Sequence, residues 1–122
     1  MRTWRQRAGK RAERKARRHL ERHGLETIAR NYSRPYGEID LVMRDGPVVV
    51  FIEVRYRGPG SWLDGVHSVD AAKRRRLTRT AASFLQAHPE YDTDPTRFDV
   101  VSVSRTNFGR RIEWVADAFT GS

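Results

Sequence analysis

The sequence predicts one α/β domain over residues 1–122, in which two helices flank a central mixed β-sheet in the order αβββαββ. Two segments repeat apolar residues with the period of a helix, and five shorter segments have the alternation or the β-branched composition of strands. An Asp-Gly pair between the second and third of these strand segments indicates a hairpin. A chain of 122 residues, 38% of them hydrophobic, is long enough to bury a core of its own.

The first predicted helix covers residues 6–23 and ends before Gly24, because glycine commonly terminates a helix. At 100° per residue, one narrow stripe of this helix contains Ala8, Ala12, Ala16, His19, Leu20 and His23. The other positions are mostly arginine and lysine. Residues 1–23 hold ten basic and two acidic side chains, so they carry +8 of the formal net charge of +9. We therefore expect a basic helix attached to a nearly neutral body.

The next three elements are strands at residues 25–32, 38–43 and 48–56. Pro35-Tyr36-Gly37 predicts a turn between the first two, because proline and glycine adopt the backbone angles that turns require. Asp45-Gly46 predicts a two-residue turn between the second and the third. Residues 38–56 are therefore expected to form an antiparallel hairpin at the centre of the sheet.

The second half of the chain supplies one helix and two more strands. In order, we expect a loop at 58–60, a helix capped by Ser68 and running to about residue 88, a turn-rich connection at 89–95, and strands at 97–104 and 111–115. The apolar face of this helix is predicted to contain Val69, Leu77, Ala81 and Phe84.

Composition excludes several classes of protein and favours a polyanionic partner. The absence of cysteine excludes a disulfide scaffold, a thiol nucleophile and a zinc site with cysteine ligands. The longest apolar run, residues 48–52, is far too short for a membrane span, and the first twenty residues contain no apolar stretch typical of a signal peptide. We therefore expect a cytoplasmic protein. Its basic charge indicates nucleic acid or an acidic membrane surface as the partner.

Acidic side chains lie within both strands of the predicted hairpin. The predicted register places Glu38 opposite Glu53, and paired residues share one face of the sheet. Asp40 then becomes a diagonal neighbour of Glu53, with the two backbones about 7–8 Å apart. Two carboxylates at this spacing can bind one divalent cation, and oxygen ligands suit Mg²⁺ or Mn²⁺. Glu13 lies at the edge of the apolar stripe of the first helix and can reach the sheet as a third acidic group.

A second interpretation of these acids stays open at this point. They can equally form salt bridges with the many arginines on a polar face of the sheet. Glu53 favours the metal site, because it interrupts a run of residues that otherwise reads as buried, and a buried acid needs a neutralising partner.

Several motifs resemble those of the YraN family of small bacterial proteins. They are Gly37-Glu-Ile-Asp-Leu-Val42, Val50-Phe-Ile-Glu-Val-Arg-Tyr-Arg57, Ala12-Glu13-x-x-Ala16, Arg30-Asn31-Tyr32, Val69-x-x-x-Lys73-x-x-Arg76-Leu77 and Arg97-Phe-Asp-Val100. That family is similar to the restriction-endonuclease-like superfamily, which includes Holliday-junction resolvases. The resemblance therefore implies a restriction-endonuclease-like fold and metal-dependent hydrolysis of phosphodiester bonds.

The signature of that superfamily is an Asp followed by Glu-x-Lys on the next strand. The resemblance implies Asp40 and Glu53 as ligands of Mg²⁺ or Mn²⁺, and Glu13 as an accessory catalytic acid. Arg55 occupies the position of the catalytic lysine, and here the sequence departs from the signature. A buried lysine can lose its proton, whereas arginine stays charged and acts only through its charge and hydrogen bonds.

The second helix offers a lysine of its own. Lys73 falls between Val69 and Leu77, inside the apolar stripe. It is either a lysine whose stem packs while its amine reaches solvent, or a catalytic cation directed at the metal site or the scissile phosphate. The candidate contacts to phosphate are Arg11, Lys15 and Arg18 on the first helix and Arg74, Arg75 and Arg76 on the second. His19 and His23 have zinc-ligand spacing, but their place on the apolar stripe favours packed or hydrogen-bonded histidines.

Three functions remain open from the sequence. The first is a metal-dependent nuclease that acts on structured or branched DNA. The second is a nucleic-acid-binding protein that retains the nuclease fold without cutting, which the arginine at position 55 favours. The third, a peripheral membrane or scaffold protein, is disfavoured because the first helix has alanines where a membrane-seeking face needs larger apolar residues. We therefore expect nucleic acid, DNA in particular, as the partner and no membrane, and a homodimer stays open.

Overall fold

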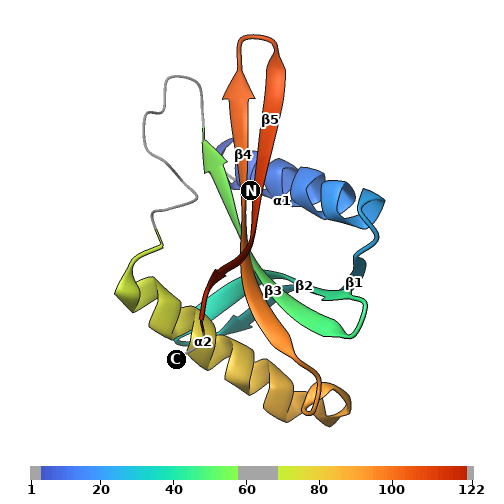
Figure 1. Ribbon diagram of the computed structural model, residues 1–122. Helices are drawn as coiled ribbons and strands as arrows, with labels where there is room; N and C mark the ends of the chain where they lie inside the picture. Colours follow the sequence, from blue (N-terminus) through green and yellow to red (C-terminus); the bar gives the residue numbers. More distant parts are fainter. Residues whose placement is uncertain (1–3, 58–68, 121–122) are drawn as a thin grey trace.

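The computed structural model describes residues 4–57 and 69–120. Its elements are α1 (Trp4–Arg22), β1 (Glu26–Arg34), β2 (Gly37–Asp45), β3 (Val48–Arg57), α2 (Ala71–Ala87), the short 3₁₀-helix η1 (Pro89–Tyr91), β4 (Thr96–Thr106) and β5 (Gly109–Phe119). The strands form one five-stranded sheet in the order β1-β2-β3-β4-β5 (Figure 1). β3 and β4 are parallel and the other neighbours are antiparallel, which confirms the predicted mixed sheet and the order of its elements.

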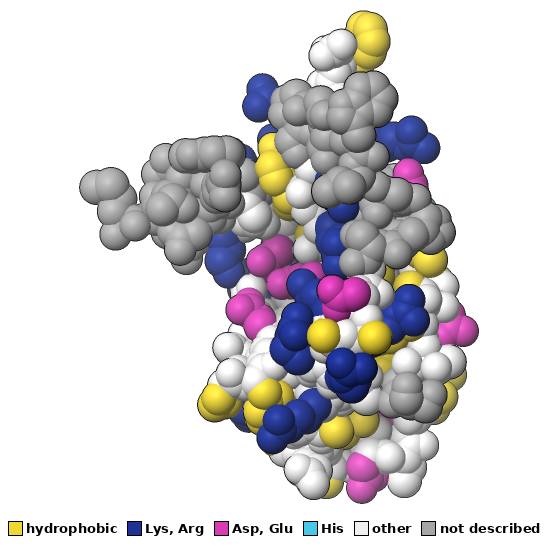
Figure 2. Space-filling model, turned by 90° about the vertical axis from the view of Figure 1, so that its left-hand side faces the viewer, with side chains coloured by type: hydrophobic (Ala, Val, Ile, Leu, Met, Phe, Trp, Pro, Cys, Tyr) yellow, Lys and Arg dark blue, Asp and Glu magenta, His cyan; other side chains and the backbone are white. Residues whose placement is uncertain are grey.

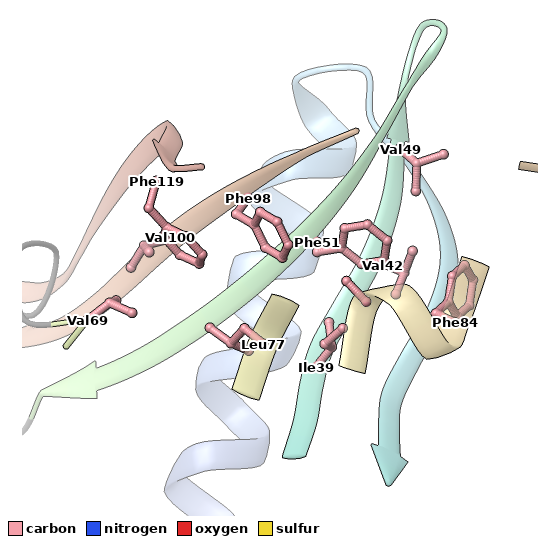
Figure 3. Close-up of a cluster of buried hydrophobic side chains, with 11 residues drawn as sticks. Ile39, Val42, Val49, Phe51, Val69, Leu77, Phe84, Phe98, Val100 and Phe119 are labelled. Atoms are coloured by element: carbon pink, nitrogen blue, oxygen red, sulfur yellow. The ribbon is translucent and has the colours of Figure 1, made fainter. Parts of the chain in front are cut away.

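The two helices cover opposite faces of the sheet, and each packs over its own hydrophobic cluster. Side chains of β3 alternate between the two clusters, so that Phe51 packs on the α2 side and Ile52 on the α1 side. The four residues predicted for the apolar face of the second helix are all buried in the α2 cluster (Figure 3). On the other face Ala12, Ala16 and Leu20 are buried, as their stripe predicts, whereas Ala8 falls outside the described side chains.

The β2–β3 hairpin turns one residue later than the sequence predicts. Asp45 pairs with Val48, so Gly46 and Pro47 form the two-residue turn, and the predicted turn at Asp45-Gly46 is wrong. Gly46 has a φ of 58°, while the ring of Pro47 holds its φ at about −65°. Positive φ at the first central position alone is the requirement of a type II′ turn. The register of the hairpin is therefore shifted by two residues relative to the prediction.

The second helix also begins later than predicted. Its N-cap is Asp70, whose carboxylate accepts a hydrogen bond from the backbone N–H of Lys73 at 2.8 Å. The predicted cap at Ser68 is therefore wrong, and Ser68 itself lies outside the described residues, as does the predicted loop at 58–60. Serine and aspartate are both strong N-caps, so local preference did not separate them. Within the described ranges, no helix combines the length and the apolar character needed to cross a membrane.

His19 and His23 are packed against the sheet. Their rings lie edge-on to Trp114, with centroids 6.5 Å and 5.7 Å away, and Nδ1 of His23 lies 2.8 Å from the carbonyl oxygen of His19. This arrangement agrees with the interpretation of the two residues as packed and hydrogen-bonded histidines.

One carboxylate, on the α1 side of the sheet, is fully buried and ties β4 to β5. Asp99 is 0% exposed and accepts hydrogen bonds from Trp114 Nε1 and from the backbone N–H of Asp117, both at 2.9 Å. The guanidinium of Arg97 lies 3.0 Å from Asp99 and 2.9 Å from Asp45. Asp117 has a φ of 53° and belongs to the irregular stretch where the β4–β5 register shifts. The Asp99 carboxylate therefore fixes a bulged part of β5.

We expect Asp99→Ala to lower the free energy of unfolding by about 3 kcal/mol or more. The substitution removes the acceptor of a buried ion pair and leaves the Trp114 Nε1–H and the Arg97 guanidinium without their partner. Urea denaturation measures the change. The exposed Glu90 is the control, because Glu90→Ala is expected to alter stability by no more than about 0.5 kcal/mol. A loss for Asp99→Ala as small as that of the control would contradict this role.

Candidate metal centre

The open ends of β2 and β3 bring two carboxylates together. The hydrogen-bonded ladder of the hairpin ends at the pair Leu41 and Ile52, and Asp40 and Glu53 are the next residue on each strand. They therefore face each other, instead of lying diagonally as the predicted register implied. Oδ2 of Asp40 accepts a hydrogen bond from the backbone N–H of Val54 at 2.7 Å, in place of a further ladder bond. We refer to Asp40 and Glu53 as the acidic pair.

Several contributions together raise the pKa of Asp40 from its ordinary value of 3.8 to about 8, and loss of hydration is the largest of them. The negative charge of Glu53 is the second contribution to this raised pKa, and Glu13 and Glu38 add smaller contributions of the same sign. The hydrogen bond from Val54 acts in the opposite direction, because it stabilises the carboxylate. Asp40 therefore holds a proton at neutral pH, and a cation bound beside it would favour the ionised form.

The second helix contributes a cation to the same place. Glu53 is only 7% exposed, and its Oε1 lies 2.7 Å from Nζ of Lys73 in the first turn of α2. This ion pair compensates part of the cost of burying the Glu53 carboxylate. The structure thus brings Lys73 to the acidic pair. The interpretation of Lys73 as a cation directed at the site requires this contact.

A pocket of about 240 Å³ lies beside the acidic pair, between α2 and the start of β2. Its lining consists of Gly37, Glu38, Asp40, Glu53, Lys73, Arg76 and Leu77. The close approach of α2 depends on Gly37, because a Cβ atom there would lie 2.6 Å from Oγ1 of Thr80. Figure 2 shows acidic side chains gathered beside lysine and arginine side chains on the face that carries the N-terminal end of α2.

Two other residues that the sequence predicts for the site, Glu13 and Arg55, are described by the structure but do not line this pocket. Glu13 instead lines a separate pocket of about 110 Å³ together with Asn31, and Nζ of Lys10 lies 3.8 Å from its carboxylate. Arg55 is half-buried two residues beyond Glu53 on β3. The negative charge of Glu13 nevertheless contributes to the raised pKa of Asp40.

Asn31 is a polar residue near the site that the sequence reasoning did not assign to it. It lies opposite Asp40 on β1, because its neighbours pair with the neighbours of Asp40. Its φ is 53°, a left-handed conformation that asparagine adopts more readily than most residues. Within the described part of the chain, its buried Oδ1 has no hydrogen-bond partner. An asparagine inside a strand segment was the signal that could have identified it.

The chemistry of the acidic pair fits a divalent cation with few protein ligands. Among residues 4–57 and 69–120, no three acidic or histidine side chains are arranged to hold a metal ion by themselves. Asp40 and Glu53 would therefore supply two oxygen ligands, and Mg²⁺ commonly completes its coordination with water and substrate phosphate oxygens. The raised pKa of Asp40 supports this fit, since it reflects negative charges held close together in a buried place.

The candidate phosphate contacts are divided between two surfaces. Arg11, Lys15 and Arg18 line a groove of about 690 Å³ between α1 and β5, together with Arg14, Arg22, Gly109, Arg110 and Ile112. We call this the basic groove. On the other face of the sheet, Arg76 lines the pocket of the acidic pair and Arg75 is exposed. Arg74 is partly structural, because its Nε donates to the carbonyl of Val69 at 2.9 Å and its guanidinium lies over the ring of Phe119.

Comparisons with known proteins agree with the resemblance seen in the motifs. The family model described as "Uncharacterised protein family UPF0102" matches residues 12–103. A UPF0102 protein of Ectopseudomonas mendocina is 47% identical, over 91% of this chain and 92% of its own length. A UPF0102 protein of Shewanella amazonensis is also 47% identical, over 91% of this chain and 97% of its own. One of Xanthomonas campestris is 47% identical, over 94% and 93%. The chain therefore belongs to UPF0102, the YraN family.

Proposed function

We propose that this protein is a metal-dependent nuclease that acts on structured or branched DNA. The observation that carries the proposal is the acidic pair, in which a half-buried Asp40 faces the buried Glu53, and Lys73 lies 2.7 Å from the Glu53 carboxylate. A mixed sheet with helices on opposite faces is compatible with a restriction-endonuclease-like fold, which we propose with it. The basic groove supports nucleic acid as the partner, because it offers positive charge along a helix to a phosphate backbone.

Each of the five candidate catalytic residues has a distinct task in this proposal. Asp40 and Glu53 hold Mg²⁺ or Mn²⁺, and the ion would supply Lewis-acid stabilisation of the phosphate and a lowered pKa of the attacking water. Lys73 stabilises the negative charge that develops on the phosphate or moves a proton at Nζ. Arg55 remains charged at every accessible pH, so it contributes charge and hydrogen bonds alone. Glu13 adds negative charge that favours the bound cation.

A nucleic-acid-binding protein without nuclease activity is the second candidate. It is favoured by Arg55, which stands where the superfamily signature has a lysine and does not line the pocket of the acidic pair. In this case the acidic pair and Lys73 would form a buried ion-pair cluster, and the basic groove would account for the function.

A cleavage assay separates the two functions. The full-length protein is incubated with single-stranded DNA, duplex DNA and a four-way junction, each in Mg²⁺, Mn²⁺ or EDTA. The nuclease proposal expects cleavage of at least the junction with Mg²⁺ or Mn²⁺ and none with EDTA. Binding of all three substrates without cleavage under any condition would contradict the nuclease and support the second candidate.

The basic groove leads to a prediction about salt dependence. Replacing Arg11, Lys15 and Arg18 together by glutamine should reduce the slope of log affinity against log salt by about two to three units, because each phosphate contact on duplex DNA contributes about 0.9. The slope is measured by fluorescence anisotropy across a salt series in EDTA. Arg34→Gln is the control, because Arg34 is exposed on β1, away from the groove. A triple variant with the slope of the wild type would show that α1 faces away from the nucleic acid.

A further inference from the structure

The β4–β5 hairpin ends in an aromatic side chain that packs on nothing. Among the described residues, Phe108 is the exposed large hydrophobic residue, at 101% relative exposure. It occupies the turn between Thr106 and Gly109, which form the last pair of the hairpin. In Figure 1 this hairpin extends beyond the body of the sheet. The position of Phe108 thus gives the fold no hydrophobic stabilisation, because its ring stays in water.

Like charges lie side by side directly below this ring. Arg105 of β4 is paired with Arg110 of β5, and both side chains are exposed. Two positive charges directly opposite each other on antiparallel strands destabilise the pair. Arg111 follows on β5 and lies 3.4 Å from Glu113, so the acid at this end of the hairpin is already engaged. An anionic partner would relieve the repulsion between Arg105 and Arg110.

The basic groove begins at the same hairpin. Gly109 and Arg110, the two residues after Phe108, line the groove together with the basic face of α1. None of the eight residues that line the groove is acidic. A flexible polyanion can therefore contact Phe108 at its tip and continue along the groove without meeting a negative charge.

We propose that the hairpin tip binds unpaired nucleotides, with a base stacked on the ring of Phe108 and phosphates between Arg105 and Arg110. The inference rests on the nucleic-acid partner of the proposed function and defines its substrate class: single strands, flaps or the unpaired region of a branched molecule. Every base has a π-face, so stacking on an aromatic ring tolerates any sequence. A base inside a continuous duplex is already stacked, so the ring gains no comparable contact there. The long basic groove favours a strand over a membrane surface, to which one ring alone gives little anchorage.

The test compares Phe108→Ala with the wild type in EDTA, on labelled oligothymidylate and on a duplex, by fluorescence anisotropy. Loss of one stacked base should weaken binding to oligothymidylate by about tenfold or more, with the affinity for duplex unchanged. Phe108→Trp should restore the affinity and Phe108→Leu should not, since the contact requires a π-face. Asn107→Ala, in the same turn, is the control and should bind as the wild type does. Because Phe108 is fully exposed, the variants are expected to fold.

Three outcomes would overturn the inference. One is wild-type affinity of Phe108→Ala for oligothymidylate, and another is an equal loss on oligothymidylate and duplex. The third is binding to vesicles of anionic phospholipid that depends on Phe108, with no such dependence on single strands. Because the assay contains EDTA, it is independent of cleavage. If the protein binds single strands through Phe108 but never cuts, the nuclease proposal is wrong and this inference stands. If the protein cuts but Phe108→Ala binds single strands as the wild type does, this inference is wrong and the nuclease proposal stands.

Discussion

Asp40→Asn is expected to lower the rate of Mg²⁺-dependent cleavage by about a thousandfold or more, the loss that follows when several kcal/mol of charge stabilisation are removed. The amide is nearly the same size as the carboxylate and its oxygen can still accept the hydrogen bond from Val54. What it removes is the negative charge of one of the two proposed ligands. In EDTA at neutral pH, binding of nucleic acid should stay intact, because the metal-free Asp40 holds a proton and the substitution then changes no charge.

Metal affinity gives a readout of the same substitution that does not depend on activity. Mn²⁺ should raise the unfolding temperature of the wild type, because an ion that binds only the folded state stabilises it. Asp40→Asn and Glu53→Gln should each lose most of this shift. Glu38→Gln is the matched control, since Glu38 lines the same pocket but is exposed, and its effect on cleavage should stay within about twofold. Equal shifts with Mn²⁺ in the wild type and in both variants of the acidic pair would refute the metal centre.

The raised pKa of Asp40 adds a pH dependence with a defined sign. Between pH 3.8 and about 8 the folded state keeps a proton on Asp40 that the unfolded chain has lost. The free energy of unfolding of the metal-free protein should therefore decrease as the pH rises across this interval. Asp40→Asn has no such proton, so at about pH 9 in EDTA it should unfold about 5 °C or more above the wild type. If the difference in unfolding temperature between Asp40→Asn and the wild type stays constant from about pH 9 down to about pH 4, the raised pKa of Asp40 is contradicted.

The hairpin shows why the acidic pair could be predicted although the register could not. The choice between Asp45-Gly46 and Gly46-Pro47 as the turn depends on backbone angles at one glycine, and the statistical preference for Asp-Gly favoured the wrong one. The resulting error was two residues. Because side chains in a strand alternate with a period of two, an error of two leaves every side chain on its predicted face, whereas an error of one would have reversed them.

Contacts between distant elements account for what the sequence left undecided. Lys73 had two interpretations on the helical wheel, and only the packing of α2 against β2, close at Gly37, brings its amine to Glu53. Glu13 and Arg55 share the pattern of the site but line no part of its pocket. Glu13 belongs to α1, which packs on the opposite face of the sheet from α2. In the sequence, Phe108 is simply a residue beside a predicted turn. Its exposure becomes informative only when the structure pairs Arg105 with Arg110 next to it.

Lys73→Met is expected to lower the rate of cleavage by about a hundredfold, the usual contribution of a positioned acid, base or charge in an active site. Methionine keeps the apolar stem that packs on the helix but carries neither charge nor proton. The same variant should bind Mn²⁺ more tightly, because Nζ of Lys73 lies 2.7 Å from Oε1 of Glu53 and competes with a metal for that oxygen. Activity and metal affinity thus change in opposite directions, which a purely structural lysine would not produce.

Two further variants decide what Lys73 does. Lys73→Arg keeps the charge and cannot release the proton, so recovery of cleavage would assign an electrostatic role and continued loss a proton-transfer role. Arg55→Lys restores the lysine of the superfamily signature, and the loss caused by Lys73→Met should be smaller in that background, because the two lysines can share the task. Equal losses in both backgrounds would mean that Arg55 and Lys73 act independently. Unchanged cleavage in Lys73→Met would remove Lys73 from the site, because a cation that contacts the reacting phosphate cannot be replaced by an apolar side chain without loss of rate.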